Sequence, residues 1–140
     1  MATPEDVIAY CPTREKCPRL WKARRAFESA EMLRQKGLLD CAANRYYYAV
    51  LHVAYHFVLG ENDTGKERPE HLELTNRYIR GEEDQYRQPA TEAVSRAQGV
   101  RNQADYSPYP VSAERLESAV SSVAGLVVRA MQRADVQRKA

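Results

Sequence analysis

The residues best suited to chemistry lie between Arg101 and Tyr106, where an arginine, an amide, a carboxylate and a phenol fall within six positions. Arg101 can donate two parallel hydrogen bonds to a phosphate group, and Asn102 and Tyr106 can add further donors. Arg101 and Asp105 stand four residues apart, so a surface ion pair on a helix is the alternative explanation for these two. That pair leaves Asn102 and Tyr106 unexplained. The segment therefore predicts a phosphodiester-binding site.

A second polar group follows one face of an earlier predicted helix. Arg45, Tyr48, His52 and Tyr55 stand at positions i, i+3, i+7 and i+10, and His56 lies one residue further round. Such a face can bind phosphate, transfer a proton or form a polar contact between subunits. The alternative is structural, with half-buried tyrosines whose hydroxyls are satisfied and a histidine at the surface.

The spacing of apolar residues predicts an all-α protein, an up-and-down bundle of four long helices plus one short inserted helix. Proline suits a first helical turn, glycine a helix end, and aspartate or serine an N-cap. On these signals the helices begin at Pro18, after Asp40 as an N-cap, at Glu70, at Pro89 and after Ser112 as an N-cap. The expected organisation is an N-terminal arm over residues 1–17, the bundle over 18–136 and a frayed tail over 137–140.

The composition is that of one globular domain. The chain has 140 residues, of which 44% are hydrophobic and 29% charged. No apolar run reaches the ~18 residues of a membrane span, and the start of the chain lacks the order of a secretory signal. We therefore expect a soluble, cytoplasmic protein that does not enter a membrane.

Basic residues are concentrated before and within the first predicted helix. Six of them lie between Arg14 and Arg25, against the single acid Glu15, although the formal net charge of the chain is only +2. This segment can steer a phosphate backbone toward the protein. The alternative is an ordinary solvated helix face.

The three cysteines, Cys11, Cys17 and Cys41, are an odd number and do not indicate a secreted disulfide scaffold. Cys11 and Cys17 are each followed by proline and can be interpreted as half of a metal site or as a redox pair. Zinc sites have tighter spacing and a second pair of ligands, so free thiols are favoured. We expect neither a metal site nor a cofactor.

Three segments together resemble HEPN-domain proteins, most of all the small stand-alone prokaryotic branch. They are AANRYYYAVLH (42–52), HLELTNRYIR (71–80) and RNQADY (101–106), and the similarity in order and spacing extends over roughly residues 20–132. The resemblance implies a bundle of four to five helices that forms a homodimer. It also implies a partner, because small members of this kind are often paired with a minimal nucleotidyltransferase in toxin–antitoxin systems.

Many HEPN proteins are metal-independent endoribonucleases with an Arg-x4–6-His motif, two copies of which meet across the dimer. The resemblance matches Arg101 to the motif arginine and Asn102 to the polar residue after it, while Tyr106 stands where the histidine would be. A tyrosine, with a pKa of ~10, is a poor general base at neutral pH. His52 or His56 could replace that histidine if their helix faces the same cleft.

The resemblance thus implies catalytic roles for Arg101, Asn102, Tyr106 and His52. Arg45, Tyr48 and Asp105 are expected to contact the substrate. The first hypothesis is an endoribonuclease or toxin component. The alternative is a catalytically degenerate dimer that binds nucleotide or RNA, or docks on a nucleotidyltransferase. A third is a structural helical subunit.

Two tyrosines beside the proposed cleft, Tyr106 and Tyr109, could accept a nucleotide if a nucleotidyltransferase partner exists. A bulky anionic adduct there would compete with substrate phosphate for Arg101.

Overall fold

The computed structural model describes residues 2–10, 12–66 and 68–139 of the chain. This part of the protein is helical and contains no strand, so the prediction of an all-α fold is confirmed. None of the described helices is long and apolar enough to cross a membrane. The helices are α1 (Pro4–Ala9), α2 (Pro18–Gln35), α3 (Leu39–Leu59), α4 (His71–Arg80), α5 (Asp84–Tyr106) and α6 (Ala113–Lys139), with a 3-10 turn, η1 (Gly60–Asn62), after α3.

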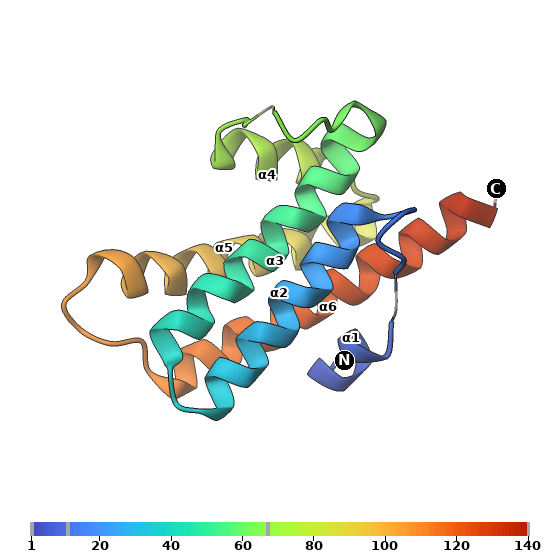
Figure 1. Cartoon of the computed structure of the whole chain (residues 1–140). Helices are drawn as coiled ribbons and strands as arrows, with labels where there is room; N and C mark the ends of the chain where they lie inside the picture. Colours follow the sequence, from blue (N-terminus) through green and yellow to red (C-terminus); the bar gives the residue numbers. More distant parts are fainter. Residues whose placement is uncertain (1, 11, 67, 140) are drawn as a thin grey trace.

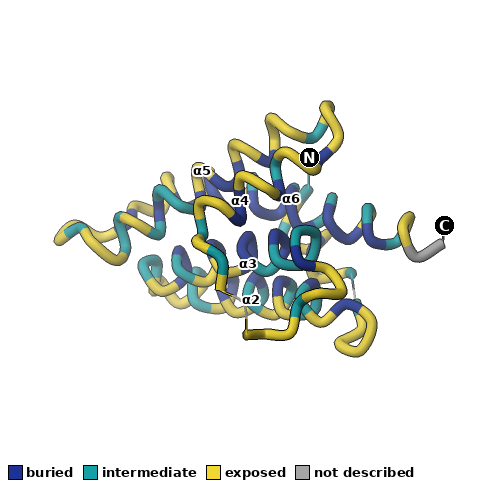
Figure 2. Tube along the Cα trace, turned by 90° about the horizontal axis from the view of Figure 1, so that it is seen from above, coloured by how far each residue is buried: buried dark blue, intermediate teal, exposed yellow. Residues whose placement is uncertain are grey.

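The four long helices, α2, α3, α5 and α6, form a helical bundle in which successive long helices run in opposite directions (Figure 1). The short α4 is inserted between α3 and α5, as predicted. Helix α3 is central, because it packs against α2, α4, α5 and α6. Figure 2 shows its buried residues in the middle of the bundle.

The arm before the bundle contains a helix that the sequence reasoning missed. Helix α1 packs against α6 and α2, and its Val7 is fully buried. Thr3 caps this helix, and the Arg24 guanidinium of α2 donates to the Ile8 carbonyl oxygen at 2.7 Å. At the other end of the chain α6 is helical as far as Lys139.

Two helix starts differ from prediction. Helix α3 begins at Leu39, so Asp40 is not its N-cap. Its carboxylate instead accepts a hydrogen bond of 2.9 Å from the Val111 backbone N–H, in the link between α5 and α6. Helix α5 begins at Asp84, five residues before Pro89. Arg87 holds this extra turn together, because it donates to the Glu82 carbonyl oxygen at 2.9 Å and pairs with Asp84.

The predicted Ser112 cap is confirmed. The Ser112 hydroxyl oxygen accepts a hydrogen bond of 3.2 Å from the Arg115 backbone N–H, one of the donors that a helix start leaves without an intrahelical partner. The cap lies directly after Val111, so the start of α6 is held close to the start of α3.

The core between α2 and α3 combines apolar packing with one buried polar network. The rings of Phe27 and Tyr46 meet edge to face, with centroids 5.3 Å apart, and both side chains are fully buried. The Tyr46 hydroxyl donates to the buried Glu31 carboxylate, to which Arg34 also donates at 2.9 Å. Burial and Glu31 raise the pKa of Tyr46, so the phenol stays protonated and keeps its role as a donor.

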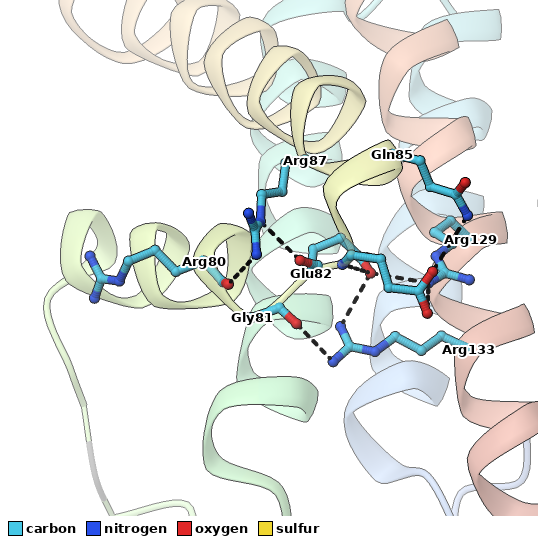
Figure 3. A network of polar contacts seen from close by, with 8 residues as sticks. Arg80, Gly81, Glu82, Gln85, Arg87, Arg129 and Arg133 are labelled. Atoms are coloured by element: carbon cyan, nitrogen blue, oxygen red, sulfur yellow. Dashed lines mark hydrogen bonds and ion pairs between the residues drawn. The ribbon is translucent and has the colours of Figure 1, made fainter.

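The turn between α4 and α5 is fastened to α6 by a buried carboxylate (Figure 3). Glu82 is only 3% exposed, and its Oε1 accepts a hydrogen bond of 3.1 Å from Arg129, with Arg133 at 3.8 Å. Arg129 also lies over the Tyr86 ring, at 3.7 Å from its centroid. Removing one partner of a buried carboxylate–arginine pair strongly lowers stability, because an uncompensated buried charge remains. This network therefore fixes the C-terminal end of α4.

Replacing Phe27 by alanine should lower the free energy of unfolding by about 3–5 kcal/mol, because the change leaves a cavity beside Tyr46. The matched control is Met32→Ala on the same helix, which is 56% exposed and should change stability by less than ~0.5 kcal/mol. Urea unfolding followed by circular dichroism measures both. Equal effects for the two variants would contradict the packing described for this core.

Candidate functional site

The segment from Arg101 to Tyr106 forms the last turn of α5 and meets the start of α3. The Arg101 Nε lies 2.9 Å from the Asp105 Oδ2, so the i, i+4 ion pair that was the alternative explanation for these two residues is present. The other Asp105 oxygen accepts a hydrogen bond of 2.7 Å from the Asn44 side chain of α3. Asp105 therefore positions the arginine with respect to both helices.

The Arg101 guanidinium lies between two tyrosine rings. Its central carbon is 5.2 Å from the Tyr47 ring centroid and 5.6 Å from that of Tyr106. Both distances lie in the range of cation–π contacts. Tyr47 is buried, whereas Tyr106 is 74% exposed, so the arginine has a packed ring on one side and an open ring on the other. Asn102 is exposed, and its amide oxygen lies 3.5 Å from the Arg101 Nη1.

A histidine from α4 joins this group. The Tyr47 hydroxyl lies 3.0 Å from the Nδ1 of His71, the first residue of α4, and the ring centroids are 5.7 Å apart. Burial, and secondarily the positive charge of Arg101, lower the pKa of His71. Its imidazole is therefore neutral at physiological pH. The Arg101 cluster thus comprises Asn44, Tyr47, His71, Arg101, Asn102, Asp105 and Tyr106.

Sequence reasoning missed Tyr47 and His71 as site residues. Tyr47 belongs to the apolar stripe of α3, which indicated packing and not chemistry. His71 is the first residue of one of the three segments that carry the family resemblance. It lies far from Arg101 along the chain, so the sequence does not indicate that the two are close in space. The sequence carries no local signal for either residue, because the contact depends on how α4 packs against α3.

Arg45, Tyr48 and His52 share one face of α3, as predicted, and border a groove between α3 and α2. This α2–α3 groove has a volume of about 450 Å³ and is lined from α2 by Lys22, Arg25, Ala26 and Ser29. Tyr48 is 40% exposed. Its ring centroid lies 6.0 Å from the guanidinium carbon of Arg45 and 6.2 Å from the ring centroid of Tyr47. Tyr48 therefore lies between the groove and the Arg101 cluster.

His52 is engaged with α2 and not with the Arg101 cluster. Its Nδ1 lies 3.3 Å from the Arg19 Nη1, and Arg19 is held by two contacts to Asp63, at 2.5 and 3.1 Å. Burial, followed by the charges of Arg19 and Lys22, lowers the pKa of His52 to about 4. The structure thus gives His52 a packing partner in place of the expected contact with the proposed catalytic arginine.

His56 lies further along α3, with its ring against Phe57 at a centroid distance of 4.7 Å. Burial and the charge of Arg133 lower its pKa. It borders the end of the bundle formed by α6 and η1, among residues that include Phe57, Gly60 and Arg133. Its described neighbours are therefore those of the opposite end of α3 from Asn44.

The remaining chemical candidates are cysteines and tyrosines. Cys17 is buried, Cys41 is exposed, and both are free thiols, while Cys11 lies outside the described residues. Among the described residues no cluster of three or more histidine, cysteine, aspartate or glutamate side chains could hold a metal ion. Tyr106 and Tyr109 are each 74% exposed. Both phenols are therefore open to a modifying enzyme.

Comparison with known proteins does not assign this arrangement to a family. Neither a scan against models of protein families nor a search of curated proteins finds a match to the chain.

The lowered pKa of His52 predicts an acid-sensitive contribution to stability. Its pKa is about 4 in the folded protein against an ordinary value of 6.5, so the unfolded chain takes up the proton first. The free energy of unfolding should therefore fall as the pH drops below 6.5. Urea unfolding at pH 7.5 and pH 5 should show a smaller loss for His52→Gln than for the unmodified protein. Equal losses would show that His52 does not titrate in this way.

Proposed function

We propose that this chain is an HEPN-like, metal-independent endoribonuclease, acting as the toxin component of a toxin–antitoxin or defence pair. The observation that supports it is the half-buried Arg101, which lies near the Tyr47 and Tyr106 rings and the Asn102 amide and is paired with Asp105, itself bound by Asn44. A guanidinium so placed can bind a phosphate and stabilise the charge that develops on it during cleavage. A homodimer, with two such sites facing one another, is part of the proposal.

The proposed reaction is cleavage of RNA by its own 2′-hydroxyl group. The 2′-hydroxyl of the RNA loses its proton to a base, and its oxygen bonds to the adjacent phosphorus. The bond from phosphorus to the 5′-oxygen breaks, and that oxygen takes a proton from water. Arg101 would stabilise the extra negative charge on the phosphate oxygens, while Asn102 and Tyr106 would donate hydrogen bonds to them.

His71 is the better candidate for the base than Tyr106 or His52. Its neutral imidazole at neutral pH can accept a proton, whereas a phenol with a pKa of ~10 does so poorly. In the tautomer that donates its Nδ1–H to the Tyr47 oxygen, the Nε2 atom is left free to accept. Tyr47 would then orient His71 through a hydrogen bond and Arg101 through a cation–π contact.

Asp105 has to be compatible with phosphate binding. It uses one oxygen for Arg101 and the other for Asn44, so its charge is already shared. The Arg101 Nε lies 2.9 Å from Asp105, and its Nη1 makes only a long contact of 3.5 Å with the Asn102 amide oxygen, which a phosphate could replace. The ion pair thus acts as a positioning contact and lowers the net charge that the site presents.

The first test is Arg101→Gln, which keeps a polar side chain but removes the charge. Purified protein should cut single-stranded RNA in the presence of EDTA, and the variant should lose activity by about 10²–10³-fold. The control is Arg80→Gln, whose side chain is exposed on α4 and points away from the bundle (Figure 3). Circular dichroism shows whether each variant is folded.

The second test concerns His71. His71→Gln should lower kcat by about 10²–10⁴-fold, the usual loss on removal of a general base. Because the pKa of His71 is lowered, the cleavage rate of the unmodified protein should rise with pH in a range below 6.5. That acid limb should disappear in His71→Gln and remain in the control His56→Gln. An unchanged pH profile in His71→Gln would exclude His71 as the base.

The alternative is a catalytically degenerate HEPN-like dimer that binds RNA or nucleotide, or docks on a nucleotidyltransferase partner. The observation that favours it is Tyr106, which occupies the position of the motif histidine and is largely exposed. Binding that depends on Arg101 without any cleavage would support this alternative. Exposed Tyr106 and Tyr109 would then be acceptors for a nucleotide from such a partner, detectable by mass spectrometry after co-expression.

A further inference from the structure

Arginines and aromatic rings are interleaved in a chain of neighbours from the segment before α2 to the end of α5. Each neighbouring pair is in contact or borders the same groove, although the residues come from three helices. One ring, that of Tyr47, is buried beneath the others. The arginine–aromatic strip consists of Arg14, Trp21, Arg25, Arg45, Tyr48, Tyr47, Arg101 and Tyr106.

The first half of the strip belongs to α2 and its approach. The guanidinium carbons of Arg14 and Arg25 lie 5.4 and 5.5 Å from the Trp21 ring centroid. Arg25 then borders the α2–α3 groove together with Arg45 of α3. Arg45 in turn lies 6.0 Å from the Tyr48 ring centroid. Basic residues of α2 and α3 thus border the same groove.

The second half carries the strip to the Arg101 cluster. The Tyr48 and Tyr47 rings meet edge to face with centroids 6.2 Å apart. Arg101 follows at 5.2 Å from Tyr47, and Tyr106 at 5.6 Å from Arg101. Tyr48 thus connects the groove to the Arg101 cluster through the buried Tyr47 ring.

The charge of this surface is positive along the groove. Lys22, Arg25 and Arg45 border it, and the residues described as lining it include neither aspartate nor glutamate. The nearby carboxylate of Glu28 is paired with Arg24 at 3.2 Å. His52 also lines the groove, and its lowered pKa keeps it uncharged at neutral pH. The groove can therefore accept phosphate groups without local repulsion.

We propose that the arginine–aromatic strip binds single-stranded RNA and leads it to Arg101. Lys22, Arg25 and Arg45 would contact successive phosphates, and Trp21, Tyr48 and Tyr106 would stack with bases. Positive grooves with interleaved aromatic rings are the common solution for single strands, because every unpaired base has a free face. A duplex keeps its bases stacked inside and cannot use the rings. The inference rests on the proposed function and assigns the surface that would hold its substrate.

The test measures binding of single-stranded oligonucleotides with 2′-O-methyl sugars, which cannot be cut through the 2′-oxygen. The double variant Arg25→Gln/Arg45→Gln should bind at least ten-fold more weakly at moderate salt. Its salt dependence should be shallower by roughly 1.4 in log–log slope, about 0.7 for each lost phosphate contact. The matched control, Arg77→Gln/Arg80→Gln, removes the same charge from exposed positions on α4 and should stay within two-fold of the unmodified protein.

The aromatic part of the strip has its own variant. Tyr48→Leu keeps an apolar side chain but removes the ring, and it should weaken single-strand binding by about five-fold or more, the lower end of measured stacking effects. A duplex of the same sequence should bind the unmodified protein at least ten-fold more weakly than the single strand. Equal binding of duplex and single strand would overturn the proposal, because charge alone would then explain the affinity.

The failure of the strip and the failure of the proposed function give different results. If Arg25→Gln/Arg45→Gln binds like its control while Arg101→Gln still abolishes cleavage, the strip is wrong and the ribonuclease stands. If the unmodified protein never cleaves RNA but the double variant loses binding, the strip stands and the ribonuclease fails. If the double variant only dissociates a dimer, seen by light scattering with RNA binding unchanged, the strip is a subunit contact and the proposal is overturned.

Discussion

The structure depends on the packing of α3 against four other helices. A helix enclosed on so many sides has little surface left, and what remains must carry any polar function that α3 has. In this chain the exposed residues of α3 form a narrow face with Cys41, Arg45 and Tyr48, and the partly buried Asn44 lies at its edge. The neighbours of α3 determine where that face leads, to α2 on one side and to α5 on the other. The position of the site is thus a consequence of how the core is filled.

Much of the fold could be predicted from the sequence, because helical periodicity is local. The long helices and the Ser112 cap follow from the spacing of apolar residues and from cap chemistry within a few positions. The prediction of Asp40 as an N-cap is wrong because its partner, the Val111 N–H, lies 71 residues away in the chain. Helix α5 begins before Pro89 because Arg87 stabilises a turn that proline alone would discourage.

The site was predictable only in part, for the same physical reason. Arg101 and Asp105 are neighbours along one helix, and their pairing was expected from an i, i+4 spacing. The contact between Tyr47 and His71 depends on where a loop delivers α4, which spacing along the chain does not specify. His52 shares a helical face with Tyr48, but its side chain contacts Arg19 of α2. Membership of the HEPN family and the ribonuclease activity stay predictions.

The buried Glu82 also has a mechanical consequence. Helix α4 is fastened at its C-terminal end to α6 through Glu82, and at its first residue it meets α3 through His71. Ten residues of helix separate these ends by roughly 15 Å, and between them the buried Leu74 and Tyr78 pack α4 onto the core. A tilt of α4 by only about 10° at the Glu82 end would move His71 by ~2.6 Å, which is enough to break a hydrogen bond. The position of His71 therefore depends in part on contacts at the opposite end of α4, made by residues that touch neither the histidine nor the arginine.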